Sequence, residues 1–153
     1  MNRFAEALHS LAVTLWAGAL WAIGLLAAPL LFKMIADRTL AGSVAGRMFL
    51  CVALLGIGCG LYLLLFRLAR FGSHALRQAF FWIVFLMLAL TLVGEFGVQP
   101  ILAALKQQAG AQAVMESVFR DRFAAWHGVA SVLYVIECAL AVPLVVLQAS
   151  APR

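Results

Sequence analysis

Two ionisable residues stand inside a long apolar stretch near the C-terminal end of the chain. Residues 123–147 read FAAWHGVASVLYVIECALAVPLVVL, and they include His127 and Glu137. An ionised group in the middle of a membrane costs roughly 3 kcal/mol, so such groups normally face other protein and find partners there. At about 100° per helical residue, the side chains that share one stripe with His127 are Ser131, Tyr134 and Cys138, with Glu137 at its edge. We therefore expect this stripe to face a second polar helix.

The preceding apolar stretch, residues 79–105, carries matching polar side chains. Thr91, Glu95 and Gln99 recur there every four residues, which places them on one face of a helix. In antiparallel helices that rise about 1.5 Å per residue, Glu95 lies in the same half of the membrane as His127. The sequence therefore predicts an intramembrane polar site in which Glu95 pairs with the His127 stripe.

This polar site has two interpretations that the sequence leaves open. A carboxylate buried between membrane helices can exchange protons or hold a cation, which would make the site functional. The same side chains can also form a structural hydrogen-bond network that locks two helices together, at roughly 1 kcal/mol per bond. The chain contains no nucleophile elbow, glycine-rich phosphate loop or HExxH motif. We therefore predict no catalytic residue and a non-enzymatic protein.

A metal site is not expected either. A protein site for zinc needs three or four N, O or S ligands that converge. Only Cys59, Glu137 and Cys138 share a similar depth among the apolar stretches, and no cysteine belongs to a CxxC pair. We interpret the cysteines as small core residues.

Composition assigns the whole chain to one class of protein. Of its 153 residues, 66% are hydrophobic and 11% are charged, whereas a soluble domain has about 25% charged residues. We predict an all-α, polytopic membrane protein that forms one domain over residues 1–153, a four-transmembrane-helix bundle. The expected spans cover residues 8–32, 47–66, 79–105 and 123–147. Pro100 predicts an irregularity in the third span near Phe96, because proline clashes with the preceding turn.

The net charge of +5 does not indicate nucleic acid. The basic residues lie almost entirely between apolar runs, where they meet lipid headgroups, and no basic stretch has the interleaved aromatic residues of an RNA-binding surface. The expected partners are the lipid bilayer and either a second copy of the chain or another membrane protein. Three arginines close to two span ends, Arg67, Arg70 and Arg77, predict that both termini are cytoplasmic.

Several short motifs together resemble one family of membrane proteins. They are APLLF at residues 28–32, Ala41-Gly42 with Gly46-Arg47 and Phe49, and Phe123 with Trp126-His127-Gly128 and Ser131. Their order and spacing are similar to the transmembrane protein 205-like family of small four-span proteins. This resemblance implies a four-helix integral domain in a bacterial cytoplasmic (inner) membrane, with no established activity.

A more distant likeness concerns the first span alone. His9, Trp16-Ala17-Gly18 and Pro29-x-x-Phe32 are similar to the first span of HemJ-type protoporphyrinogen oxidases and copper-resistance D-like membrane proteins. That likeness implies haem b or a metal ion bound at His9, although this chain lacks the third-span lysine of the HemJ-type pattern. His9 and His127 lie about 20 Å apart along the membrane normal, so they cannot both ligate one haem. We predict no cofactor and keep a haem- or metal-binding redox protein as the alternative.

Overall fold

A computed structural model describes residues 3–109 and 118–149. All regular elements in these two ranges are helices. The α-helices are α1 (Arg3–Trp21), α2 (Ala28–Met34), α3 (Arg38–Phe71), α4 (Ala79–Leu92), α5 (Gln99–Ala109) and α6 (Arg120–Ala149). Two π-helical segments, η1 (Ala22–Ala27) and η3 (Val93–Val98), and one 3₁₀ segment, η2 (Gly72–Arg77), connect them.

These elements join into four long helices that are apolar enough to cross a membrane. Their bounds are Arg3–Met34, Arg38–Arg77, Ala79–Ala109 and Arg120–Ala149. The predicted fold class, an all-helical protein with four potential membrane spans, is therefore confirmed. Each observed helix is longer than the predicted span, because the helix continues past the apolar run into its basic flanks.

The second helix departs most from its predicted limits. Its predicted apolar span begins at residue 47, whereas α3 begins at Arg38. The carboxylate of Asp37 accepts hydrogen bonds from the backbone N–H groups of Thr39 and Leu40, at 2.8 and 3.1 Å. A side-chain cap of this kind satisfies backbone donors that the first turn of a helix leaves free. The connection between the first two long helices is consequently only three residues long, residues 35–37.

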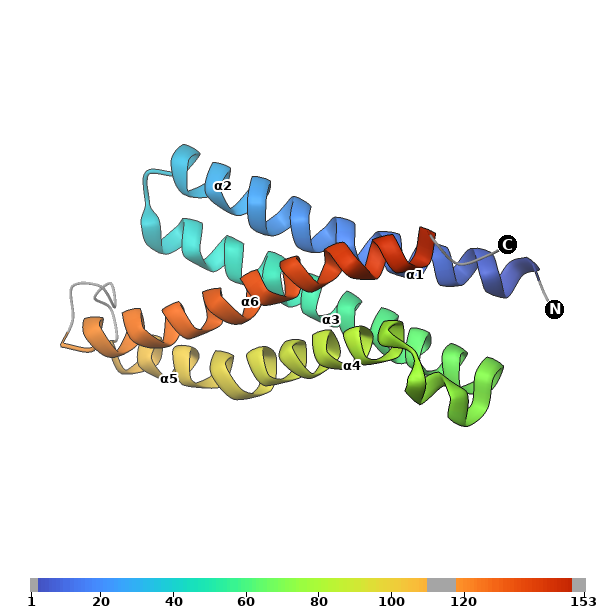
Figure 1. Cartoon of the computed structure of the whole chain (residues 1–153). Coiled ribbons are helices and arrows are strands. Elements are labelled where there is room, and N and C mark those ends of the chain that lie inside the picture. The colour runs from blue at the N-terminus through green and yellow to red at the C-terminus, as the bar shows by residue number, and fades with distance from the viewer. Residues whose placement is uncertain (1–2, 110–117, 150–153) are drawn as a thin grey trace.

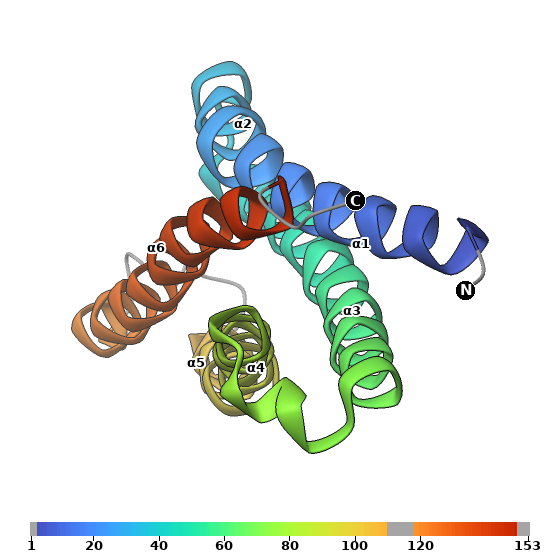
Figure 2. The same cartoon turned by 45° about the vertical axis from the view of Figure 1, so that its right-hand side comes forward.

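The four long helices form a ring in the order α1, α3, α4, α6, and α6 packs back against α1 (Figures 1 and 2). In this ring α1 lies diagonally opposite α4, and α3 lies diagonally opposite α6. The largest fully buried side chains come from all four helices: Trp16, Leu20, Leu63, Met87 and Leu144. Trp16 fits against Gly56 and Gly60 of α3, where a methyl group on Gly56 would lie 2.5 Å from the indole Nε1. Small residues thus allow the close helix approach that packing in lipid requires.

The first and third long helices repeat one backbone irregularity 71 residues apart. The π-helical segment at residues 22–27 precedes Pro29, and the one at residues 93–98 precedes Pro100. Each ends on an N–H bonded to the carbonyl five residues back, from Ala28 to Ile23 and from Gln99 to Gly94. A π turn spreads the backbone before a proline that would otherwise clash with the preceding turn. The irregularity expected near Phe96 therefore takes the form of a π segment.

The buried positions of α1 and α4 follow the same offset. Five of the six buried residues in each helix correspond: His9 and Phe80, Val13 and Val84, Trp16 and Met87, Ala17 and Leu88, Leu20 and Thr91. The bundle is therefore two similar helical hairpins, one built from α1 to α3 and the other from α4 to α6. Two of the equivalent buried pairs differ in polarity, His9 with Phe80 and Leu20 with Thr91, which makes the two hairpins chemically unequal.

Candidate functional site

A buried contact between Thr91 and Glu137 joins the third and fourth long helices. Only 7% of Thr91 and 6% of Glu137 is exposed. The Thr91 hydroxyl is hydrogen-bonded to Glu137 Oε1, and it also lies 3.0 Å from the carbonyl oxygen of Met87. Because a hydroxyl carries one proton, it can donate to only one of these oxygens at a time. When it donates to Met87, its bond to Glu137 persists only if Glu137 is protonated and donates to Thr91; when it donates to Glu137, the carboxyl group can be ionised.

This pair can therefore hold or release one proton with only a hydroxyl rotation. Its heavy atoms keep their places, so both protonation states of Glu137 have a hydrogen-bond partner. That property distinguishes the contact from an ordinary structural bond, in which loss of the proton leaves a buried group unpaired. Among the described residues, Glu137 is a buried carboxyl group whose hydrogen bond can persist in either protonation state.

Tyr134 connects the same helix, α6, to the first one. Its hydroxyl donates to the Leu20 carbonyl at 2.7 Å, and its ring meets Phe49 edge to face at 4.9 Å. Gly24 lies so close that a methyl group there would be 2.2 Å from Tyr134 Cε1. One turn further along α6, the indole N–H of Trp21 donates to the Cys138 carbonyl at 3.0 Å. Together with the Thr91–Glu137 contact, these interactions form what we call the polar junction: Trp21, Thr91, Tyr134 and Glu137.

Glu95 and Gln99 face a different neighbour from Thr91. Both are half-buried, and they line a cleft between α3 and the η3–α5 segment. The cleft has a volume of about 560 Å³, and its lining residues are Ser43, Gly46, Arg47, Leu50, Glu95, Gln99, Pro100 and Ala103. From the last residue of the π segment onward, buried apolar residues take the inner face instead: Val98, Leu102 and Leu105. The predicted polar stripe is therefore divided, with Thr91 in the polar junction and the other two residues in this end cleft.

The structure does not bring Glu95 and His127 into contact. His127 is exposed, and its ring stacks on Phe123 with centroids 5.8 Å apart. No hydrogen bond or ion pair joins Glu95 to His127 within residues 3–109 and 118–149. Ser131, also exposed, donates to the backbone carbonyl of His127 at 2.9 Å rather than to another helix. Of the predicted site, the structure thus brings together Thr91 with Glu137, and Glu95 with Gln99.

A simple count along the helices could have found the observed pairing. Thr91 stands eighteen residues before the end of α5 at Ala109, and Glu137 stands seventeen residues after the start of α6 at Arg120. The equivalent counts for Glu95 and His127 are fourteen and seven, a mismatch of about 10 Å at 1.5 Å per residue. Arg47 was not among the predicted site residues. The sequence feature that could have indicated Arg47 is its position directly before the apolar run that begins at Met48.

His9, the residue behind the haem alternative, is buried at the opposite end of the bundle. Its ring packs against Phe66 and Phe80, with centroids 5.0 and 5.3 Å away, and its Nε2 has no hydrogen-bond partner. The described residues hold no group of three or more His, Cys, Asp or Glu that could bind a metal ion. A metal ion would thus find one ligating nitrogen among phenyl rings, and the side chains described there do not fit such an ion.

The fold and site together define a small all-helical protein with four helices of membrane-spanning length and a polar junction buried among them. Residues 11–111 match the family described as "Domain of unknown function (DUF4149)", and the chain belongs to this family. The match covers most of the first long helix and all of the second and third, and it ends before α6. No curated protein and no solved structure matches the chain. The family brings no activity with it, so function has to be argued from the geometry.

Proposed function

We propose that the protein is a small, non-enzymatic permease that handles protons or small cations through the polar junction and the end cleft. The observation that carries this proposal is the Thr91–Glu137 pair, which accepts either protonation state while it stays buried. Glu95 lies four residues beyond Thr91, about 6 Å further along the helix. It therefore provides the next carboxylate on a path from the buried pair to the end cleft.

The repeated backbone irregularity supports transport rather than a purely structural role. Transporters are often built from internal repeats, and their sites lie where interrupted helices of the two halves meet. Here the π segments occupy corresponding positions in the two hairpins, and both are followed by a proline. Gly24, in the middle of η1, lies against Tyr134 of the polar junction, and η3 carries Glu95.

We assign the protein to the transmembrane protein 205-like group and to a bacterial cytoplasmic membrane, with both termini cytoplasmic. The motif order of the sequence supports the first two assignments, and the arginines of residues 67–77 support the third. A reporter tag after Arg153 and another within residues 67–77 should both report the cytoplasmic side. Tags on opposite sides would contradict the four-span arrangement.

The transport proposal is tested with purified protein in liposomes that enclose a pH-sensitive dye. With a potassium diffusion potential applied, the wild type should acidify the lumen faster than protein-free liposomes do. Glu137→Gln keeps the shape of the side chain and a hydrogen bond to Thr91 but removes the titratable group, so proton uptake should fall to the protein-free rate. Asp121→Asn, which alters an exposed carboxylate at the start of α6, is the matched control and should behave as the wild type.

A wild type no faster than empty liposomes would reject proton transport. Unchanged uptake in Glu137→Gln would instead show that protons pass by another route. In the first case the remaining candidate is a packing partner of other membrane proteins, for which the polar junction serves only to lock the helices. In the second case the polar junction again only locks the helices, and transport does not use Glu137.

A further inference from the structure

The end cleft runs lengthwise between two helices. Its lining residues on the third long helix recur every four positions: Glu95, Gln99 and Ala103. Its lining residues on α3 are spaced three or four positions apart: Ser43, Gly46, Arg47 and Leu50. Because such spacing keeps side chains on one face of a helix, the two walls form a groove that follows the helix axes.

This groove leads from the membrane surface into the apolar layer. Arg47 directly precedes the apolar run of residues 48–66, so it marks the level at which the helix leaves that layer. Glu95 lies ten residues before the end of its predicted span at Leu105, which is about 15 Å along the helix. The surface in question is the one where α3 begins and α5 ends, opposite the start of α1 and the end of α6 (Figure 1).

The corresponding position in the first hairpin is filled by an aromatic ring. At the offset of 71 residues, Gly24 corresponds to Glu95. The ring of Tyr134 on α6 lies so close to Gly24 that a side chain there would collide with it. On the other side of the ring of helices, the residues that line the end cleft include no aromatic side chain, and a volume of about 560 Å³ stays open.

The open space is bordered by polar groups that need partners. Within residues 3–109 and 118–149, neither Glu95 nor Arg47 forms an ion pair or a side-chain hydrogen bond. The backbone N–H of Gln99 donates to the Gly94 carbonyl, and Pro100 has no N–H, so the Glu95 carbonyl lacks the donors that a helix normally supplies one turn further on. Such groups are tolerated at membrane depth where they line a water-filled cavity. At about 30 Å³ per molecule, the cleft has room for roughly fifteen waters.

We infer that water enters the end cleft from the surface beside Arg47 and delivers protons to Glu95, whereas lipid covers the corresponding face of the first hairpin. The inference rests on the proposed function, for which it names the entrance and the medium that brings the proton. The Glu95 carboxylate accepts a proton from a hydronium ion and leaves water behind. Transfer of that proton to the Glu137 carboxylate, whose partner Thr91 lies about one turn further in, restores the charge of Glu95.

The test is hydroxyl-radical footprinting of the full chain in lipid nanodiscs, with X-rays generating the radicals from water itself. Radicals oxidise side chains that lie next to water and leave those covered by lipid unmodified. Pro100 lines the cleft, and Pro29 holds the equivalent position in the first hairpin; both are exposed on the protein surface. Pro100 should be oxidised several-fold faster than Pro29, and equal rates would overturn the inference.

A pair of leucines gives a second comparison at matched depth. The ring of Phe49 meets the ring of Tyr134, which lies against Gly24, so Leu50 and Leu25 are at a similar level. Leu50 lines the cleft and is 40% exposed, whereas Leu25 lies outside it and is 61% exposed. Water in the cleft should make Leu50 the faster of the two to be oxidised, despite its smaller exposed fraction. Faster oxidation of Leu25 would contradict the inference.

Two glycines of α3 provide a variant that blocks the cleft and its control. An added Cβ meets nothing within 4 Å at either Gly46 or Gly42, but only Gly46 lines the cleft. Gly46→Trp should slow both the oxidation of Pro100 and proton uptake into liposomes several-fold, whereas Gly42→Trp should leave both as in the wild type. Undiminished oxidation of Pro100 in Gly46→Trp would show that its water does not come through the cleft, and would overturn the inference.

Footprinting needs no ion gradient, so the two proposals can fail separately. A protein whose Pro100 and Leu50 are oxidised faster than their counterparts, but which moves no protons, fails the transport proposal alone. A protein that moves protons without this difference in oxidation fails the inference alone.

Discussion

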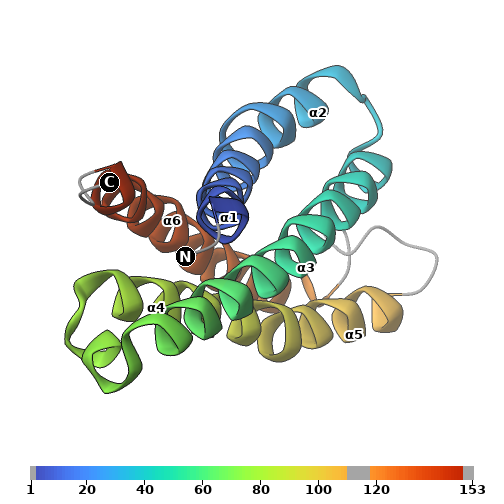
Figure 3. The same ribbon diagram turned by 90° about the vertical axis from the view of Figure 1, so that its right-hand side faces the viewer.

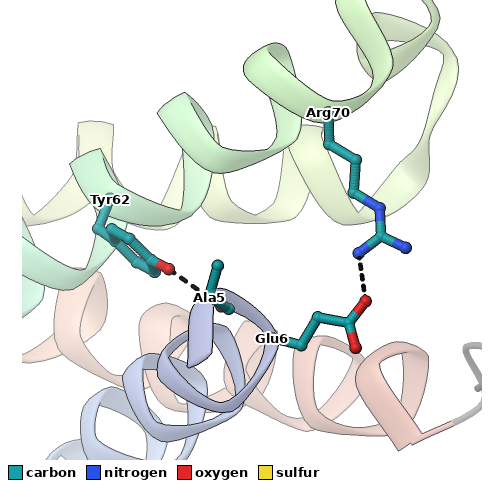
Figure 4. A network of polar contacts seen from close by, with 4 residues as sticks. All are labelled: Ala5, Glu6, Tyr62 and Arg70. Atoms are coloured by element: carbon teal, nitrogen blue, oxygen red, sulfur yellow. Dashed lines mark hydrogen bonds and ion pairs between the residues drawn. The ribbon is translucent and has the colours of Figure 1, made fainter. Parts of the chain in front are cut away.

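The two ends of the bundle differ in how their helices are held together. At the end that carries the N terminus, Tyr62 donates to the Ala5 carbonyl at 3.1 Å, and Arg70 pairs with Glu6 at 3.1 Å (Figure 4). Beneath these contacts lies the buried ring of His9. At the other end α2 and the start of α3 run away from α5 (Figure 3), and α2 buries none of its residues.

This difference lies in the side chains that the two ends bring together. The end that carries the N terminus, which we call the closed end, has aromatic packing and polar contacts between three helices. The other end, which we call the open end, has the end cleft, whose charged side chains form no ion pair within the described residues. The polar junction lies between them, next to both π segments. Because the two hairpins share their backbone pattern, the contrast arises from side chains, as with Leu20 and Thr91 at equivalent positions.

The largest effect is expected from crowding the tightly packed part of the bundle. Gly56→Ala places a methyl group 2.5 Å from the indole Nε1 of Trp16, a side chain that is fully buried. Overpacking of this kind should lower the free energy of unfolding by roughly 2–3 kcal/mol. Gly58→Ala, on the exposed side of the same helix, meets nothing within 4 Å and is the matched control. Denaturant unfolding in detergent measures both, and equal stabilities would show that Trp16 yields without cost.

The second-largest loss of stability is expected from the polar junction, which lies between the two ends. Thr91→Val removes the hydroxyl that partners Glu137 and leaves a buried carboxyl group without its hydrogen bond. The expected loss is roughly 1–2 kcal/mol, at the upper end for polar contacts between membrane helices. Thr14→Val is the control, because Thr14 donates to the Ser10 carbonyl at 2.9 Å in the same way but is exposed and faces no carboxylate. A similar loss in both variants would assign the effect to the helix and not to Glu137.

A smaller effect is expected from the ion pair of the closed end. Arg70 and Glu6 are 32% and 50% exposed, so water and salt screen their attraction. A double-mutant cycle of Arg70→Gln and Glu6→Gln should give a coupling of about 0.5 kcal/mol in dilute buffer, and this coupling should disappear in about 1 M salt. A coupling that persists in salt would mean that the closed end is held by this pair more firmly than its exposure suggests.

The sequence predicted the four helices because each contains a long apolar run with basic flanks, and a run of that length is enough for a helix to cross a membrane. It did not predict the limits of α3, which depend on a single cap at Asp37. The site was harder, since a period of 3.6 residues assumes an unbroken α-helix. The π segment at residues 93–98 interrupts that period, so Thr91 turns toward Glu137 while Glu95 turns toward α3. Pro100 indicated an irregularity in the helix, but not toward which neighbouring helix Glu95 would then face.

The smallest expected effect tests whether Glu95 and His127 act together, as the periodicity predicts, or apart, as their positions indicate. Glu95 lines the end cleft, and His127 stacks on Phe123 at an exposed position of α6. Groups without shared partners contribute additively to stability, so the double-mutant cycle of Glu95→Gln and His127→Gln should give a coupling within about 0.5 kcal/mol of zero. The cycle of Thr91→Val with Glu137→Gln, measured in the same detergent, provides the positive comparison, because those two side chains share a hydrogen bond. A Glu95–His127 coupling as large as that of the bonded pair would show that the open end closes in solution and brings the two residues together.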